Sequence, residues 1–244
     1  MNVFCLSSAG RKPGQNEDSF IAGGTVSSDG DYQAELKPPF FCGAADGVSG
    51  EKSGDIASAL ALSVLCGMRL TEKTDILKSV MDIHKFLKSE GERRKSANMQ
   101  TTLCVAAVFS HKIKIANVGD SRAYLYKAGK LTQITRDQSL LQLLYEQGQL
   151  SKREKNNFLH KNIILPALGN IHDDPAPELI EIPPLSHGEI LFICTDGFSD
   201  FVNEETTEQI LKRPENLGAR LKLLLNRAIM NGSKDNITLL TLTN

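Results

Sequence analysis

The stretch LFICTDGFSDFV, residues 191–202, ends an apolar run on a charged side chain. Its first five residues have the composition of a buried strand, yet Asp196 follows them directly. A buried carboxylate without a partner costs several kcal/mol, so the chain must turn into solvent there or match the charge with a cation or a metal ion. The stretch FFCGAADGVSG, residues 40–50, repeats the arrangement with Asp46. Two such stretches weaken the simplest interpretation, a common Asp-Gly turn.

The composition favours one folded domain without a strongly charged surface. A chain of 244 residues with 41% hydrophobic content can bury a full core and fits one large domain, residues 1–244, better than two. Its 28 basic and 29 acidic residues give a formal net charge of −1, so we expect neither a nucleic-acid nor a membrane partner. We expect a monomer.

The cysteines indicate a reducing compartment. All five lie in or near apolar runs, and none forms a CxxC pair. This pattern is typical of reduced, buried thiols in a cytosolic protein. The longest apolar stretch, residues 56–68, is too short to span a bilayer, and the N-terminus lacks the features of a signal peptide. We therefore expect a cytoplasmic protein.

Hydrophobic periodicity predicts strands and helices that are grouped rather than strictly alternating. The expected elements are helices at 53–69 and 73–95, an antiparallel meander at 101–135 with turns at 120 and 127–129, a strand at 191–195, helices at about 204–212 and 216–231, and a closing strand at 237–243. This grouping favours an α+β fold over a doubly wound parallel sheet. Residues 25–39 are expected to form a loop or hairpin insertion, and the long polar excursion at 139–188 is typical of a functional segment or a lid.

Five acids share a position at the end of an apolar strand. They are Asp18, Asp46, Asp120, Asp196 and Asp235. Each alone could cap a turn or a strand end. Together they indicate a cation, because the ends of neighbouring strands lie close together and like charges there repel one another. Oxygen ligands without clustered His or Cys favour Mg²⁺ or Mn²⁺, and four or five carboxylates suit two ions better than one.

The glycines and histidines fit this interpretation. Gly47 and Gly197 each follow one of the acids, where a residue without a side chain allows a sharp turn or the approach of a carbonyl or a substrate. The five histidines are scattered without ligand spacing, so we interpret them as ordinary surface or core residues.

The ordered motifs NEDSF, ADGVSG, QTTLCVAAV, NVGDSRAYLY, TRDQSL, ICTDGFSD and DNITLL resemble those of the metal-dependent Ser/Thr protein phosphatases, the PPM or type 2C family, in its compact bacterial form. The match runs from about Ser7 to Leu242. The resemblance implies a four-layer α-β-β-α sandwich, with a central antiparallel β-sandwich flanked by helices. It also implies a dinuclear Mg²⁺ or Mn²⁺ site at one end of the sandwich and a flap subdomain at about 139–188.

The resemblance also assigns roles to single residues. The positions that match metal ligands are Glu17, Asp18, Asp46, Gly47, Asp120, Asp196 and Asp235. Asp46 would bridge both ions, the Gly47 carbonyl would bind one of them, and Asp196 and Asp235 would complete the pair. In bacterial relatives the aspartate that matches Asp120 helps the one that matches Asp196 to hold a third, weaker ion.

Glu17 and Asp18 would act directly or through water, and Asn236 and Thr102 match supporting positions. The chemistry suits a phosphoserine or phosphothreonine monoester, which carries about −1.5 to −2 charges. Two ions about 3.5–4 Å apart can clamp its oxygens and generate a bridging hydroxide for in-line attack on phosphorus. No sequence motif indicates a covalent nucleophile. The resemblance thus implies that the metal ligands Asp46, Asp196 and Asp235 carry catalysis.

Two positions depart from the family pattern. Pro13 stands where the family commonly has a phosphate-gripping arginine, so we assign that role to Arg11 as a substitute. Residues 48–50 read Val-Ser-Gly where many eukaryotic members have His-Gly-Gly. A metal-bound water or solvent would therefore protonate the leaving oxygen.

Three functions compete at this point. The first is an active phosphatase whose substrates are phosphorylated proteins, the products of a Ser/Thr kinase. The second is a pseudophosphatase that binds phosphoproteins as a regulatory module, which the proline at position 13 would suit. The third, a two-metal hydrolase of nucleotides, lacks a base-stacking or phosphate-loop signature. Mutually repelling acids favour the first, because an inactive descendant has no reason to retain them.

Overall fold

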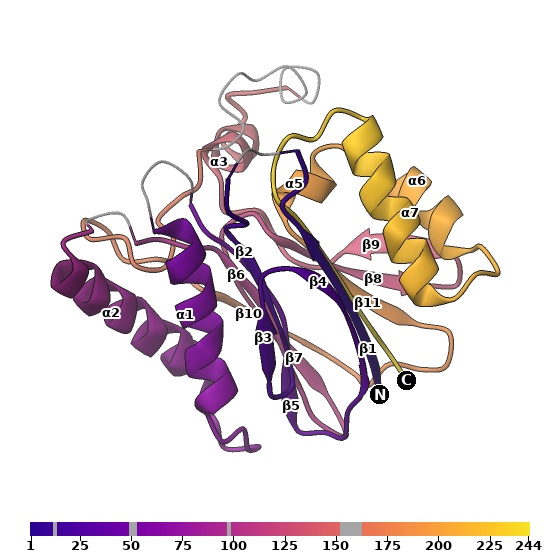
Figure 1. Ribbon diagram of the computed structural model, residues 1–244, viewed down its shortest axis with the longest axis horizontal. Helices are drawn as coiled ribbons and strands as arrows, with labels where there is room; N and C mark the ends of the chain where they lie inside the picture. The colour runs from indigo at the N-terminus through magenta and orange to yellow at the C-terminus, as the bar shows by residue number, and fades with distance from the viewer. Residues whose placement is uncertain (12–13, 49–52, 97–98, 152–162) are drawn as a thin grey trace.

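The computed structural model describes residues 1–11, 14–48, 53–96, 99–151 and 163–244. Within them, two six-stranded antiparallel sheets pack face to face (Figure 1). The first sheet has the order β4 (Gly30–Glu35), β1 (Asn2–Ser8), β12 (Ile237–Thr243), β11 (Ile190–Cys194), β8 (Arg122–Lys127), β9 (Lys130–Gln133). The second has the order β10 (Glu178–Ile182), β7 (Ile113–Val118), β6 (Leu103–Val108), β5 (Phe40–Asp46), β2 (Asp18–Ala22), β3 (Thr25–Ser27).

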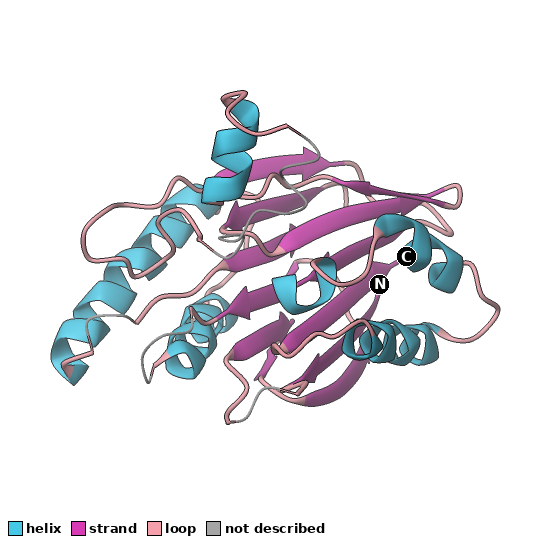
Figure 2. Ribbon diagram, turned by 90° about the horizontal axis from the view of Figure 1, so that it is seen from above, coloured by secondary structure: helices cyan, strands magenta, loops and turns pink. Residues whose placement is uncertain are grey.

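Helices cover the outer face of each sheet (Figure 2). The second sheet is covered by α1 (Gly54–Gly67) and α2 (Ile76–Arg94), and the first by α5 (Asp196–Ser199), α6 (Glu204–Leu211) and α7 (Leu217–Met230). A short helix, α3 (Leu140–Glu146), lies beyond one end of the sandwich. The expected α+β fold with four α-β-β-α layers is therefore confirmed.

The apolar runs around the acids are long because their strands are buried on both faces. In β11, Leu191 and Ile193 join the core between the two sheets, whereas Phe192 and Cys194 join the core under α5, α6 and α7. Strand β5 is divided in the same way between the inner core and the core under α1 and α2. A strand with two buried faces reads as a continuous hydrophobic run instead of an alternating one.

The predicted meander is wrong. Strands β6 and β7 pair in the second sheet, and β8 and β9 pair in the first. The chain therefore crosses from one sheet to the other at residues 119–121, and Asp120 lies in this crossover instead of a hairpin turn. The loop or hairpin insertion expected at 25–39 is also wrong, because this segment contributes β3, which pairs with β2, and β4, which pairs with β1. Alternation predicts strands but does not say which sheet each one joins.

The excursion at 139–188 returns to the sandwich at several points. Its two arms pair near their start, where Leu140 N–H donates to Ile163 O (2.8 Å). The excursion ends in β10, an edge strand beside β7 that the sequence did not reveal. Helix α2 holds the returning arm through the buried His84, whose Nδ1 accepts the N–H of Gly169 (3.1 Å).

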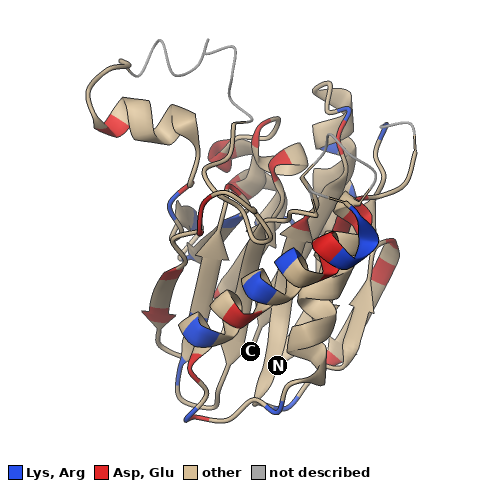
Figure 3. Ribbon diagram, turned by 90° about the vertical axis from the view of Figure 1, so that its left-hand side faces the viewer, with Lys and Arg blue, Asp and Glu red and all other residues tan. Residues whose placement is uncertain are grey.

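The described surface shows no single-sign face along α2. Basic and acidic residues are interspersed along this helix (Figure 3). This agrees with the balanced net charge. No helix in the described ranges combines the length and the apolar composition needed to cross a membrane.

Candidate metal centre

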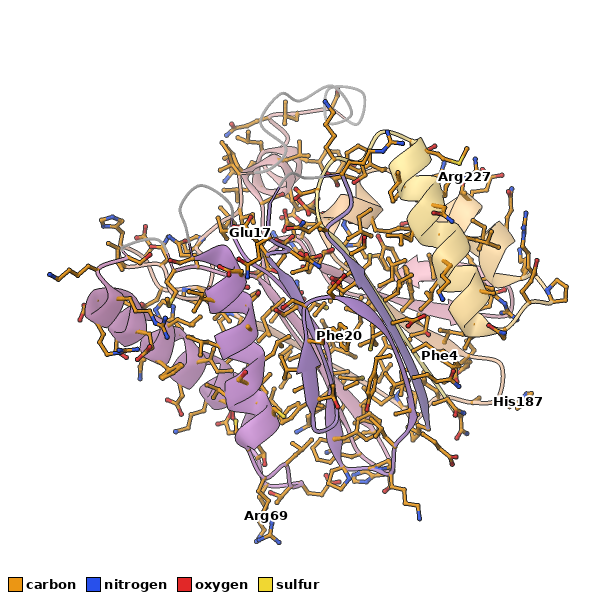
Figure 4. The ribbon with its side chains drawn as sticks, in the orientation of Figure 1. Phe4, Glu17, Phe20, Arg69, His187 and Arg227 are labelled. Carbon is orange, nitrogen blue, oxygen red and sulfur yellow. The ribbon has the colours of Figure 1, made fainter. Side chains whose placement is uncertain are left out.

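The strand-end acids meet at one end of the sandwich. Asp18 begins β2 and Asp46 ends β5, and the two residues are register partners in the second sheet. From the first sheet, Asp196 follows β11 as the first residue of α5, and Asp235 directly precedes Asn236 and β12. Figure 4 shows the neighbouring Glu17 at this end and Arg69 at the opposite one. The site is therefore built from both sheets.

Burial and mutual repulsion disfavour the charged form of Asp18, Asp46 and Asp196. Burial, and then the charges of Asp18, Asp196, Asp120 and Asp235, raise the pKa of Asp46 well above its usual value. Burial is also the main cause that raises the pKa of Asp18 to about 7 and that of Asp196 to about 6. Beyond burial, the charges of Asp200 and Asp235 raise the pKa of Asp196, whereas the neighbouring Asp46 lowers it. Five charges this close require a cation if they are all to remain ionised.

Asp120 belongs to the same group. Its side chain is buried, with 8% of the residue exposed. Burial first and the charge of Asp196 second raise the pKa of Asp120, whereas the nearby Arg122 guanidinium lowers it. The structure therefore brings Asp120 close to Asp196 from a different part of the chain.

Two carboxylate oxygens have no hydrogen-bond partner in the described structure. Asp18 Oδ2 accepts the Thr195 hydroxyl (2.8 Å), but Asp18 Oδ1 and Asp196 Oδ1 are buried without a partner. Orphaned oxygens on mutually repelling acids fit Mg²⁺ or Mn²⁺, both of which prefer oxygen ligands. Among the described residues, no three His, Cys, Asp or Glu side chains form a ready ligand group for one ion. Such ions usually keep several waters, so one or two carboxylates per ion suffice.

The two Asp-Gly pairs need glycine because another part of the main chain passes close by. A Cβ on Gly47 would lie 2.2 Å from the carbonyl oxygen of Gly54, in the first turn of α1. A Cβ on Gly197 would lie 2.0 Å from the carbonyl oxygen of Asn236. Real Cβ atoms do not approach so closely, so the expected clearance for a carbonyl is confirmed at both positions.

Main-chain hydrogen bonds hold the acids in place. Thr102 accepts the Asp46 N–H through its hydroxyl (3.0 Å) and donates its own N–H to the Asp46 carbonyl (2.8 Å). Asn236 accepts the Glu17 N–H (2.9 Å) and donates to the Ala9 carbonyl (3.2 Å). These contacts agree with the supporting roles expected for Thr102 and Asn236.

Sequence reasoning missed Thr195. Its hydroxyl donates to Asp18 and accepts the N–H of Thr238 (3.0 Å), so it ties an acid of one sheet to a strand of the other. The sequence did contain a feature that could have indicated this role, because Thr195 is the polar residue between the apolar run and Asp196.

Arg11 lies in a loop that is anchored beside the site. The preceding Gly10 has a φ of +63°, and a Cβ there would lie 2.2 Å from the Asp235 carbonyl oxygen. The Arg11 side chain is exposed, and positions 12 and 13 lie outside the described residues. Its role at phosphate therefore stays a prediction.

We expect Arg11→Ala to raise the KM for a phosphothreonine peptide several-fold while kcat changes less. A guanidinium that holds ground-state phosphate contributes largely uniform binding, and its loss appears in KM. Steady-state kinetics with Mn²⁺ measures both parameters. Arg69→Ala, an exposed change at the opposite end of the molecule, is the control. An unchanged KM would mean that Arg11 is an ordinary solvated loop residue without a role in phosphate binding.

Comparisons with known proteins agree with this geometry. The family model for protein phosphatase 2C matches residues 9–141. The chain is 33% identical over 207 residues to the serine/threonine phosphatase stp of Listeria monocytogenes, which covers 80% of this chain and 81% of that protein. The crystal structure of the Mycobacterium tuberculosis serine/threonine phosphatase PstP/Ppp matches with a TM-score of 0.81 and 26% identity over 100% of both chains.

A second solved structure that resembles this chain contains manganese ions. The catalytic domain of the phosphatase PstP, in complex with two manganese ions, matches with a TM-score of 0.77 and 26% identity, covering 99% of this chain and 98% of that one. Sequence, fold and the position of the acids lead to one assignment: the chain belongs to the protein phosphatase 2C family.

Proposed function

We propose that this chain is a metal-dependent protein phosphatase that hydrolyses phosphoserine and phosphothreonine monoesters. The observation that carries the proposal is the meeting of five strand-end aspartates, two of them with orphaned oxygens, at one end of the sandwich. Family membership and the similarity to the Listeria serine/threonine phosphatase stp support it. No observation favours the pseudophosphatase or the nucleotide hydrolase.

In this proposal the chain's own residues hold two ions and orient the phosphate. Asp46, Asp196, Asp235 and the Gly47 carbonyl would hold the ions, with Glu17 and Asp18 acting directly or through water. When bound, two such ions neutralise phosphate oxygens and activate a water for attack on phosphorus. Thr102 fixes the main chain of Asp46, and Thr195 fixes one oxygen of Asp18, so both carboxylates are pre-oriented. Solvent protonates the leaving oxygen, since Val48 stands at the histidine position.

The remaining parts of the proposal concern partners and cell location. The PstP structure with manganese supports Mn²⁺ as one usable ion, and Mg²⁺ and a third, weaker ion are proposed alongside it. We further propose a monomer whose substrates are the products of a Ser/Thr kinase. Residues 139–188 would act as a flap of a single domain. Four of the five cysteines are buried as free thiols, which supports the proposed cytoplasmic location.

Chelator should abolish phosphate release. With a phosphothreonine peptide, excess EDTA should lower the rate more than tenfold, and added Mn²⁺ or Mg²⁺ should restore it, because the acids alone repel the phosphate. Release of inorganic phosphate measures the rate. Full activity in chelator would contradict the proposal, and tight Mn²⁺ binding without turnover would favour the pseudophosphatase.

A further inference from the structure

The motif TRDQSL, residues 135–140, leads into the long excursion at 139–188 and forms its root. Two of its side chains, Asp137 and Gln138, hold the crossover that carries Asp120. Asp137 binds Arg122, two residues after Asp120, and Gln138 binds Gly119, directly before it. The crossover is thus held on both sides by the root of the excursion. The sequence motifs do not predict either contact, because the bonded residues lie 15 and 19 positions apart in the chain.

The Arg122–Asp137 pair has a two-pronged geometry. Arg122 Nε lies 2.9 and 3.0 Å from the two Asp137 oxygens, and Nη2 lies 2.6 Å from Oδ2. The side chains are only 21% and 12% exposed. Gln133 donates a further bond to Asp137 Oδ1 (2.8 Å). Such an arginine–carboxylate fork fixes orientation as well as distance.

The same guanidinium also reaches the helix that begins with Asp196. Arg122 Nη1 donates to the Ser199 carbonyl oxygen (3.3 Å), and Nη2 lies 3.7 Å from Asp200 Oδ1. Ser199 ends α5, a single turn that starts at Asp196, so a contact at its last carbonyl constrains the first residue. One side chain, two residues after Asp120, therefore connects the root of the excursion with the Asp196 helix.

Gln138 forms the second connection. Its side-chain Oε1 accepts the Gly119 N–H (3.1 Å), and its own N–H donates to the Gly119 carbonyl (2.9 Å). Its Nε2 donates to the Ala176 carbonyl in the returning arm (2.9 Å), and its carbonyl accepts the Leu165 N–H (2.9 Å). Through Gln138, the Asp120 crossover is thus connected to two points of the returning arm.

We propose that Arg122 and Gln138 are positioning residues that set the distance between the Asp120 and Asp196 carboxylates, and thereby the metal affinity of the position that these two acids share. Arg122 does not grip phosphate in this proposal, because its fork is committed to Asp137 and to the end of α5. The inference rests on the proposed metal-dependent function. It adds two residues that would touch neither metal nor substrate to those on which metal binding depends.

The test compares Arg122→Gln, Asp137→Asn and their double variant with the wild-type chain. Mn²⁺ affinity is measured by calorimetry, and kcat and KM are measured with a phosphothreonine peptide. We expect Arg122→Gln to weaken at least one Mn²⁺ site and to lower kcat, each by about tenfold or more, with little change in KM. The double variant should be no worse than Arg122→Gln, because both changes break the same contact.

Arg136→Gln is the matched control, since it removes a neighbouring arginine that is 59% exposed and pairs with Glu146. It should leave Mn²⁺ affinity and kcat unchanged. If Arg122→Gln does not fold, the Mn²⁺ affinity and kcat of Asp137→Asn decide the test. That change breaks the same contact with almost no change in side-chain volume. A raised KM with unchanged kcat would overturn the proposal in favour of phosphate gripping. A lower melting temperature with unchanged Mn²⁺ affinity would reduce the residue to a structural role.

Failure of the proposed function is distinguishable from failure of this inference. A wild-type chain that binds Mn²⁺ but releases no phosphate would refute the phosphatase. The Mn²⁺ affinities of the variants would still test the positioning role in that case. Unchanged Mn²⁺ affinity in both single variants refutes the positioning role whatever the activity.

Discussion

Asp46→Asn should lose nearly all turnover and yet make the metal-free protein more stable. The carboxylate is a proposed ligand of both ions, so its loss should lower kcat by about 100-fold or more. In the absence of metal, its charge faces four other acids and its pKa is strongly raised. Replacement by an uncharged amide of the same shape removes that repulsion. It should raise the free energy of unfolding of the metal-free protein by about 1–3 kcal/mol. Asp196→Asn should behave in the same way.

The stability gain should depend on pH. Asp18 and Asp196 have folded-state pKa values of about 7 and about 6, raised from 3.8. A raised carboxyl pKa favours folding below the unfolded value, and the advantage is lost as pH rises through the folded value. The metal-free wild-type chain should therefore lose stability between about pH 4 and pH 7, and the asparagine variants should lose less. Thermal melts in EDTA at pH 5 and pH 8 measure the difference.

Asp82→Asn is the control, because the pKa of Asp82 is lowered where that of Asp46 is raised. Asp82 lies on the exposed face of α2, and its hydrogen bond with Lys78 lowers its pKa. Its replacement should not stabilise the metal-free protein and should leave kcat unchanged. Near-normal turnover of Asp46→Asn with Mn²⁺ would contradict the assignment of the metal ligands. A destabilised metal-free variant would contradict the repulsion argument.

Asp120→Asn should depress turnover by about 10- to 100-fold while the two tighter ions still bind with nearly unchanged affinity. Asp46, Gly47 and Asp235 remain in place, so only an ion shared by Asp120 and Asp196 should be affected. The change keeps the shape of the side chain, which is buried in the crossover between the sheets. Calorimetric Mn²⁺ titration beside peptide-phosphatase rates checks both parts.

Two results would contradict the role of Asp120 at an additional ion. Activity within a few-fold of wild type would mean that asparagine replaces a purely structural contact. Loss of tight Mn²⁺ binding together with activity would mean that Asp120 supports the two main ions instead. Ser199→Ala, a small change in α5 that leaves the Asp120 and Asp196 carboxylates in place, is the control and should keep turnover and Mn²⁺ affinity close to wild type.

The acids could be predicted from sequence because each interrupts an apolar run that its strand must bury. Gly47 and Gly197 could be predicted for the same reason, since they follow the acids directly. The crossover at Asp120 could not be predicted, because two hairpins in different sheets have the same alternation as one meander. Strand β10 was missed because it lies in a polar segment flanked by prolines and pairs only along one edge.

The contacts of Arg122 also could not be predicted from the sequence. A charged residue in a strand gives no sign of which acid it will meet, and Asp137 becomes its partner only through the return of the chain after β9. Thr195 is similar, because its acceptor on Asp18 is 177 residues away. Long-range polar contacts of this kind depend on how the two sheets are placed against each other.

The burial of the thiols offers a way to observe this molecule. All five cysteines lie in the described ranges, and only Cys66 is partly exposed, whereas burial raises the pKa of Cys5, Cys42, Cys104 and Cys194. Protonated, inaccessible thiols react slowly with alkylating reagents. A maleimide dye should therefore label the folded chain at one position near the C-terminal end of α1. That helix abuts Gly47 at its other end, so the dye would be attached at the end of α1 that faces away from the metal centre.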